Sequence, residues 1–232
     1  MKHLWKGGIP LVLLGAVAVP VGQGCIKAET PFFIRSTKTQ GCDAVSVDGT
    51  DLGEGRMDAR YACSYSAVLE LGNQLVKRGD ETKLQVETSR ISVTSFDVVT
   101  VDESTGAQIS AFTTPSTGFV DPSSGGEPGY GLAAALLVDR AGANALKAAG
   151  GGRIIAQITA HGRTLGGDDI SSREFDFPIN VCVGCLCSTP TDDTCVSSMS
   201  SPKEQCFFPQ DSPFDCRFLG GHDCSEDLSC VL

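Results

Sequence analysis

Residues 175–187 read FDFPINVCVGCLC, and they divide the chain into two parts of different composition. Up to Val181 the sequence alternates apolar and polar residues and holds few cysteines. After Val181, eight of the eleven cysteines follow within 51 residues. A segment this short cannot bury enough apolar surface to fold alone, so it needs covalent cross-links. We therefore predict a β-rich domain over residues 31–181 and a disulfide-stabilised module over residues 182–232.

The strand that opens this stretch has a predicted partner just before it. Residues 153–161 and 175–181 both alternate apolar and polar side chains, as half-buried strands do. A hairpin that turns at Gly167 and Asp168 brings both apolar faces to one side of a sheet. The predicted opposite pairs are Ala160 with Phe175, Ile158 with Phe177, and Ile154 with Val181.

The rest of the first domain shows the same preference for strands. Residues 69–75 alternate with Glu70 on the exposed side, and a phase slip near Ser95 predicts a β-bulge. We expect residues 113–131, which are rich in glycine and proline, to form a long surface loop. Asp139 is placed to cap a short helix that begins at Ala141 and ends at Ala149. Together these features predict a mainly β fold, an antiparallel immunoglobulin-like β-sandwich with one short helix.

The N-terminal residues 1–24 have the pattern of an export signal. Lys2 and Lys6 precede a run of 13 uncharged residues from Ile9 to Val21, which is too short to span a bilayer. The run leads into VGQGC, which ends at Cys25. This ending resembles the lipobox of bacterial lipoproteins, although Gly22 stands where that family usually has leucine. The resemblance implies cleavage before Cys25 and acylation of that cysteine, while the alternative is cleavage at the same bond followed by free secretion.

The number of cysteines supports acylation. Eleven is an odd number, so an exported chain with only intramolecular disulfides leaves one thiol over. Acylating Cys25 leaves ten for five disulfides, which we predict among Cys42, Cys63, Cys182, Cys185, Cys187, Cys195, Cys206, Cys216, Cys224 and Cys230. Residues 25–30 then form the lipidated N-terminus and a short tether. Residue 26 is isoleucine, and for a lipoprotein this implies sorting to the outer membrane of a two-membrane bacterium.

The pairing of these cysteines remains open, because eight cysteines in the tail allow 105 combinations. Cys42 and Cys63 are expected to pair with each other or to join the two modules. Cys185 and Cys187 lie too far apart in an extended chain to pair, so we expect both to reach downstream partners. The CxxC of Cys182 and Cys185 could instead bind zinc or act as a redox dithiol, but it stands without a second CxxC.

Other polar groups offer weaker candidate sites. The acidic stretch 48–58 gathers carboxylates as calcium sites do, without the EF-hand spacing. His161 is predicted to face Glu174 across the hairpin as a surface pair. The sequence contains no GxSxG, P-loop or HExxH motif. Aspartates 168, 169, 192 and 193 are expected in turns.

These features favour a non-enzymatic, lipid-anchored protein of the cell envelope with a binding or structural role. Acidic residues outnumber basic ones by 28 to 18, which disfavours nucleic acid as a partner. The expected partners are the membrane, through the N-terminal lipid, and a second envelope protein. We expect no cofactor and no metal. The alternative is an exported hydrolase or a calcium-dependent binding protein whose carboxylate site forms only in the folded chain.

Overall fold

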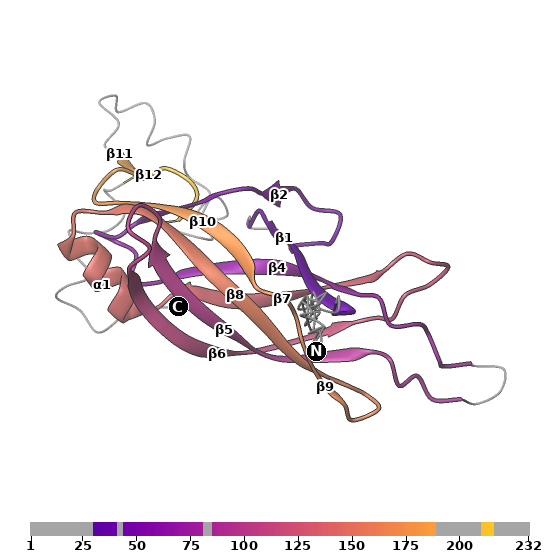
Figure 1. Ribbon diagram of the computed structural model, residues 1–232. Helices are drawn as coiled ribbons and strands as arrows, with labels where there is room; N and C mark the ends of the chain where they lie inside the picture. Colours follow the sequence, from indigo (N-terminus) through magenta and orange to yellow (C-terminus); the bar gives the residue numbers. More distant parts are fainter. Residues whose placement is uncertain (1–29, 41–43, 81–84, 189–209, 216–232) are drawn as a thin grey trace, which may run out of the picture.

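The computed structural model shows two large β-sheets that pack face to face, a separate pair of two-residue strands, and one helix at the edge (Figure 1). The structure describes residues 30–40, 44–80, 85–188 and 210–215. The predicted mainly β sandwich with one short helix is confirmed. Among the described residues, no helix is long and apolar enough to cross a membrane.

The smaller sheet has four strands, and all its pairs are antiparallel. Their order is β2 (Asp51–Leu52), β1 (Phe32–Lys38), β4 (Tyr65–Asn73) and β7 (Gly129–Val138). The larger sheet has the order β3 (Gly55–Asp58), β10 (Phe175–Cys182), β8 (Gly152–Thr164), β5 (Ile91–Asp102) and β6 (Gln108–Val120), with β9 (Asp169–Ser171) paired to β8. Strand β3 is parallel to β10, and the other pairs of this sheet are antiparallel.

The core lies between the inner faces of the two sheets. Alternate residues of each strand point inward, as the predicted period of two requires. Tyr65 and Phe177 face each other from the two sheets with ring centroids 6.4 Å apart. The largest fully buried side chains are Tyr65, Phe32, Phe96, Phe177, Met57, Leu69, Leu71, Ile91, Leu137, Ile154, Ile158 and Ile179.

The hairpin of β8 and β10 has the predicted faces but not the predicted register. Phe175 lies opposite Ile158, Phe177 opposite Ala156, and Val181 opposite Gly152. This is a slip of two residues, which keeps every apolar side chain on the core face because the side-chain period is two. The slip arises at the turn, because Arg163 pairs with Asp169 and Gly162 with Ile170, so the turn is centred on Gly166 and not on Gly167 and Asp168 as predicted. A one-residue irregularity between β9 and β10, where the Ser172 side chain accepts from Ala160 N–H at 2.8 Å, then shifts the pairing back by one.

The β-bulge near Ser95 is confirmed. The register of β5 shifts between Val93 and Ser95 against both of its neighbours, β6 and β8. This bulge returns Phe96 to the core face, where it is fully buried together with Ile91.

The predicted loop over residues 113–131 is wrong. Strand β6 continues to Val120 and β7 begins at Gly129. Pro115 is tolerated because β6 is an edge strand of its sheet. A Cβ on Gly118 would lie 2.7 Å from the Leu132 carbonyl oxygen, which is too close for any side chain, so this glycine permits the close approach of β6 to β7.

The helix α1 (Arg140–Ala148) forms as predicted. Asp139 is its N-cap and accepts from Gly142 N–H at 2.9 Å. Lys147 lies in the last turn, and Gly150 follows with φ of +82°. The buried side of α1 includes Ala143 and Leu146.

The sandwich has two distinct ends. At the entry end, where the chain enters β1, Phe32 lies beside Asn73, and the Asn73 amide donates to the carbonyls of Ser89 and Val120. At the exit end, where the chain leaves β10, Cys182 lies beside Asp58 of β3. The two ends are separated by the length of β5, whose 12 residues span about 40 Å.

Candidate functional site

The exit end carries a tight turn closed by a disulfide. Strand β10 ends at Cys182, and Cys182 is bonded to Cys185 with their Cα atoms 5.8 Å apart. Gly184 has φ of +81°, a left-handed conformation that glycine adopts without strain. The turn brings the two cysteines within disulfide range. The prediction that Cys185 reaches a downstream cysteine is therefore wrong.

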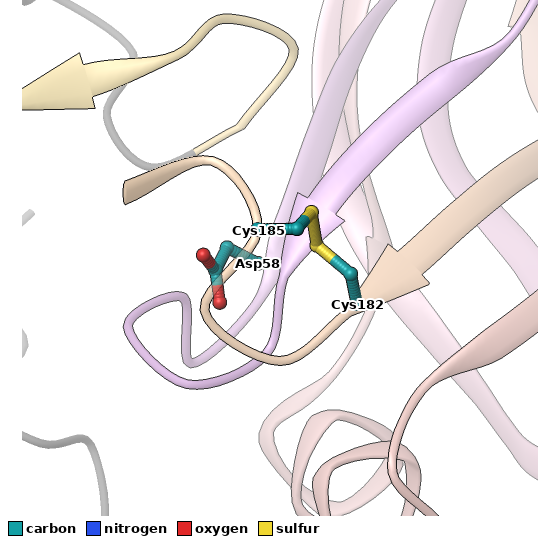
Figure 2. A group of neighbouring side chains, drawn as sticks. All are labelled: Asp58, Cys182 and Cys185. Carbon is teal, nitrogen blue, oxygen red and sulfur yellow. A yellow bond between two sulfur atoms is a disulfide. The ribbon is translucent and has the colours of Figure 1, made fainter. Parts of the chain in front are cut away.

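A buried carboxylate holds this turn in place. Asp58 is fully buried, and its Oδ1 accepts from Gly184 N–H at 2.7 Å and Arg60 N–H at 3.1 Å. Its Oδ2 accepts from Leu186 N–H at 3.1 Å. Figure 2 shows the Asp58 carboxylate inside the loop that leads from Cys182 past Cys185. The carboxylate thus replaces the water that these backbone donors would otherwise need.

Among the described residues, the group with the spacing of metal ligands is Asp58, Cys182 and Cys185, whose ligand atoms lie within 4.8 Å of one another. Zinc sites use cysteine thiolates, but both of these sulfur atoms are bonded to each other. The carboxylate is already engaged by three backbone N–H groups. In this oxidised state the group is a structural turn.

The remaining predicted cysteines have different outcomes. Cys63 is in a disulfide, and its partner is not among the described side chains, so the pairing with Cys42 stays a prediction. The backbone of Cys187 lies in β11 (Cys187–Ser188), which pairs in parallel with β12 (Phe214–Asp215). The other predicted cysteines lie outside the described residues; they are Cys25, Cys42, Cys195, Cys206, Cys216, Cys224 and Cys230.

A second part of the tail returns to the exit end. Tyr65 O–H donates to the Asp211 carboxylate at 2.9 Å, and Arg56 N–H donates to the same carboxylate at 2.8 Å. The Gln210 side chain both donates to and accepts from the backbone of Ser66. Burial raises the pKa of Tyr65 above its ordinary range and also raises that of Asp211. Residues 210 and 211 thus fasten this part of the tail to both sheets.

The outer face of the larger sheet holds a chain of hydrogen-bonded side chains. His161 Nε2 lies 2.8 Å from Asp97 Oδ2, and His161 Nδ1 lies 2.8 Å from Ser171 Oγ. Thr113 donates to the other oxygen of Asp97 at 2.6 Å. The predicted pair of His161 and Glu174 is wrong, because the hairpin register differs and Glu174 instead contacts Gln157.

The chemistry of this chain follows from Asp97. The Thr113 hydroxyl and His161 hold the pKa of Asp97 below its ordinary value, so the carboxylate is ionised and accepts. His161 therefore donates from Nε2 when neutral, which leaves Nδ1 to accept from Ser171 O–H. Ser171, His161 and Asp97 thus form a hydroxyl–imidazole–carboxylate chain, but the serine contacts Nδ1 and the carboxylate Nε2, which is the reverse of the arrangement in serine hydrolases. Sequence reasoning missed Ser171 and Asp97 because they lie 10 and 64 residues from the histidine.

The acidic stretch 48–58 does not assemble into one site. Asp51 pairs with Lys38 at 2.7 Å, Glu54 pairs with Arg153 at 3.2 Å, and Asp58 serves the exit-end turn. A calcium ion is coordinated by about six to eight oxygen ligands around one centre, whereas these carboxylates bind different partners in different places. Asp168 lies in the β8–β9 turn as predicted, with Thr164 N–H donating to its carbonyl at 2.9 Å. Asp169 is instead the first residue of β9 and pairs with Arg163, so its predicted place in a turn is wrong. Aspartates 192 and 193 lie outside the described residues.

A buried ion pair lies on the outer face of the smaller sheet. Lys38 Nζ lies 3.0 Å from Glu70 Oε2, and both side chains are nearly inaccessible to solvent. Arg35 and Ser36 also donate to Glu70, at 3.1 Å each. The prediction of an exposed Glu70 is wrong because these residues of β1 lie over it. The ion pair is fully hydrogen-bonded, which is the arrangement that makes buried charges tolerable.

No protein-family model matches this sequence, and no curated protein matches it significantly. The fold class is therefore defined by the structure itself, as a β-sandwich with a disulfide-closed turn at one end.

Proposed function

We propose that this protein is a non-enzymatic lipoprotein of the bacterial cell envelope that presents its cysteine-rich module away from the membrane. One observation carries the proposal: the chain enters the sandwich at one end and leaves it at the other. An acyl group on Cys25 then holds the entry end near the bilayer. The exit end, with residues 182–232 attached, lies about 40 Å farther out, given the length of β5.

The contacts at the exit end indicate that the tail is fastened to the sandwich and does not hang from a flexible linker. Asp58 and the Cys182–Cys185 disulfide fix the first turn of the tail, and Asp211 fixes a later part to Tyr65 and Arg56. The described segments 182–188 and 210–215 are therefore both held against the sandwich. Such rigidity favours a binding or structural role, because less entropy is lost when a partner binds.

Anchoring is tested by expressing the full chain in a two-membrane bacterium and measuring the intact mass of the product. We expect a mature chain that begins at Cys25, carries a diacylglyceryl adduct and fractionates with the outer membrane. The Cys25→Ser variant should lack the adduct and leave the membrane fraction. An unmodified mature chain in the medium would instead support free secretion.

The binding role is tested with a photo-crosslinking residue placed at Val183, which is exposed at the exit end. We expect one protein adduct of defined size in intact cells. The matched control places the same residue at Val76, at the entry end, where we expect no adduct of that size. Identical adducts at both positions, or none at Val183, would contradict presentation of the exit end to an envelope partner.

A second candidate function is an exported serine hydrolase, and the Ser171–His161–Asp97 chain is the observation that favours it. It ranks second because Ser171 and Asp97 are exposed to water, whereas electrostatic catalysis is strongest in sites that exclude water. A fluorophosphonate probe decides between the two. Labelling that disappears in both Ser171→Ala and His161→Gln would establish the hydrolase, and an unlabelled native protein would exclude a reactive serine.

A further inference from the structure

The entry end carries a group of exposed apolar side chains. In the described part of the chain, five large hydrophobic residues are strongly exposed, and four of them lie at this end. Their exposed fractions are 74% for Val76, 75% for Val86, 59% for Phe119 and 52% for Leu165. The fifth, Val183, lies at the exit end. We call the four residues the apolar tip.

The apolar tip is built from three segments that are fastened to one another. Val76 forms a bridge with Ser123, beyond the end of β6. Leu165 N–H donates to the Arg90 carbonyl at 2.9 Å, and the Arg90 guanidinium lies over the Phe119 ring at 5.9 Å. Figure 1 shows the loops beyond β4, β6 and β8 extending from this end of the sandwich.

The arm that follows β4 is also held by specific bonds. Glu87 accepts from Arg78 N–H at 3.0 Å and from Gly79 N–H at 2.7 Å with one oxygen. Its other oxygen accepts from Ser89 N–H at 2.6 Å. The backbone beside Val86 is therefore fixed while its side chain stays in water. Exposed apolar groups that gather at one end of a molecule are typical of a contact surface, whereas single scattered ones are not.

The chain enters the sandwich at the same end. Gln74 N–H, next to Val76, donates to the Pro31 carbonyl at 2.7 Å. Pro31 lies six positions after Cys25, and a fully extended segment of this length spans at most about 21 Å. A lipid on Cys25 therefore holds the apolar tip close to the bilayer.

We propose that the apolar tip contacts the lipid bilayer and seats the entry end on its surface. This inference rests on the proposed acylation of Cys25, because the lipid brings the tip to the membrane. Insertion of the tip would bury the four side chains and set the direction in which the sandwich projects. A lipid anchor alone leaves that direction free, whereas added apolar contacts fix it.

Charge at this end points to apolar contact as the driving force. The basic residues Lys77, Arg78, Arg90 and Arg163 stand among the acidic residues Asp80, Glu87, Asp121, Glu127, Asp168 and Asp169. A surface of mixed sign has no strong preference for anionic headgroups. The appropriate probe is therefore a vesicle of zwitterionic phosphatidylcholine.

The experiment uses tryptophan fluorescence, because Trp5 is the only tryptophan and lies in the predicted leader. The mature chain from residue 26 onward, with an N-terminal histidine tag in place of the acylated cysteine, is tethered to phosphatidylcholine vesicles through a nickel-chelating lipid. Val76→Trp and Phe119→Trp report on the tip, and Val183→Trp is the matched control. Brominated acyl chains quench an indole that enters the bilayer.

We expect brominated lipid to quench about half of the emission of Val76→Trp and Phe119→Trp, with a blue shift, and less than about a tenth for Val183→Trp. Replacing Val76, Val86, Phe119 and Leu165 together by serine should lower binding of the untethered chain to vesicles at least about tenfold. Far-ultraviolet circular dichroism checks that this variant is folded.

Equal quenching at both ends, or none at the tip, would overturn the proposal. A tip that instead joins two copies would give a dimer in size-exclusion chromatography without quenching, which also overturns it. The artificial tether keeps the two hypotheses separate. Missing acylation on Cys25 in the intact mass refutes the lipoprotein assignment, while an unquenched tethered chain refutes the membrane contact alone.

Discussion

The two ends of the sandwich differ in which side chains are buried and which are exposed. At the exit end, polar groups are buried and each is matched: the Asp58 carboxylate accepts three backbone N–H groups, and Tyr65 donates to Asp211. At the entry end, apolar side chains such as Val76 and Phe119 remain exposed on well-bonded backbone. Burying polar groups requires partners within the chain, whereas exposing apolar groups is explained by a partner outside it.

This difference predicts where substitutions act. At the exit end, a change should reduce the free energy of unfolding, since the bonds there hold the tail to the sandwich. At the entry end, apolar substitutions should leave that free energy nearly unchanged and alter contact with the membrane.

The largest effect is expected for Asp58→Ala. Removing the carboxylate leaves the buried N–H groups of Gly184 and Leu186 without acceptors, and each unsatisfied group costs about 1–3 kcal/mol. We expect the free energy of unfolding to fall by about 3 kcal/mol, measured by urea denaturation of the oxidised protein.

The control for Asp58→Ala is Asp176→Ala, since Asp176 is exposed on the neighbouring strand β10. Surface substitutions of this kind change stability by about 0.5 kcal/mol or less. If Asp58→Ala were as mild as its control, the exit-end turn would be held by the disulfide alone and the carboxylate would be incidental.

A smaller effect is expected for the double substitution Cys182→Ala with Cys185→Ala. The disulfide closes a loop of four residues, for which loop-closure entropy gives about 2 kcal/mol. The loss should be smaller than that of Asp58→Ala, because the N–H groups of the turn keep their acceptor. A loss larger than that of Asp58→Ala would show that the disulfide, and not the carboxylate, organises the turn.

Tyr65→Phe should cost about 1 kcal/mol, the usual net value of one hydrogen bond. The ring stays in the core against Phe177, and only the donor to Asp211 is lost. Hydrogen exchange should increase at Asp211 N–H, which donates to the Arg56 carbonyl. Tyr130→Phe is the control, because its ring remains beneath Arg35. Unchanged exchange at Asp211 would mean that the returning segment is held by other bonds.

Local patterns in the sequence were enough to predict much of the fold. The alternation in β8 and β10, the phase slip at Ser95 and the Asp139 cap each depend on residues close together in the chain. The hairpin register was not predictable from them, because a slip of two residues preserves the faces. The position of the β8–β9 turn and the one-residue irregularity before β10 decide the register, and the apolar pattern marks neither.

The candidate sites depend on contacts that no local pattern contains. Asp58 meets Gly184 and Leu186 at separations of more than 120 residues, so nothing in the acidic stretch 48–58 predicts its place at the exit-end turn. The glycine-rich residues of β6 and β7 resembled a loop, although Gly118 serves the close approach of two strands. Glycine is common both in loops and where two strands approach closely, and only the packing of the folded chain distinguishes the two.

The smallest predicted effect concerns Glu87 at the entry end. Burial alone would raise its pKa, but the N–H groups of Gly79, Ser89 and Arg78 outweigh burial and hold the pKa below its ordinary value of 4.5. A carboxyl group with a lowered pKa in the folded state stabilises that state above its unfolded pKa. The contribution is lost as the pH falls through the folded pKa.

We therefore expect the arm beside Val86 to loosen in acid before the sandwich unfolds. Nuclear magnetic resonance should show the amide signals of Gly79 and Ser89 shifting together with the Glu87 carboxyl, at a pH below 4.5. Glu87→Gln should raise local hydrogen exchange at Gly79 near pH 7 and remove this titration, with a global loss below about 1 kcal/mol. If the variant instead destabilised the whole sandwich, the entry end would share the exit end's role in stability. The hydrogen bonds of Glu87 would then serve the stability of the whole sandwich, and not only the local order of the arm that carries Val86.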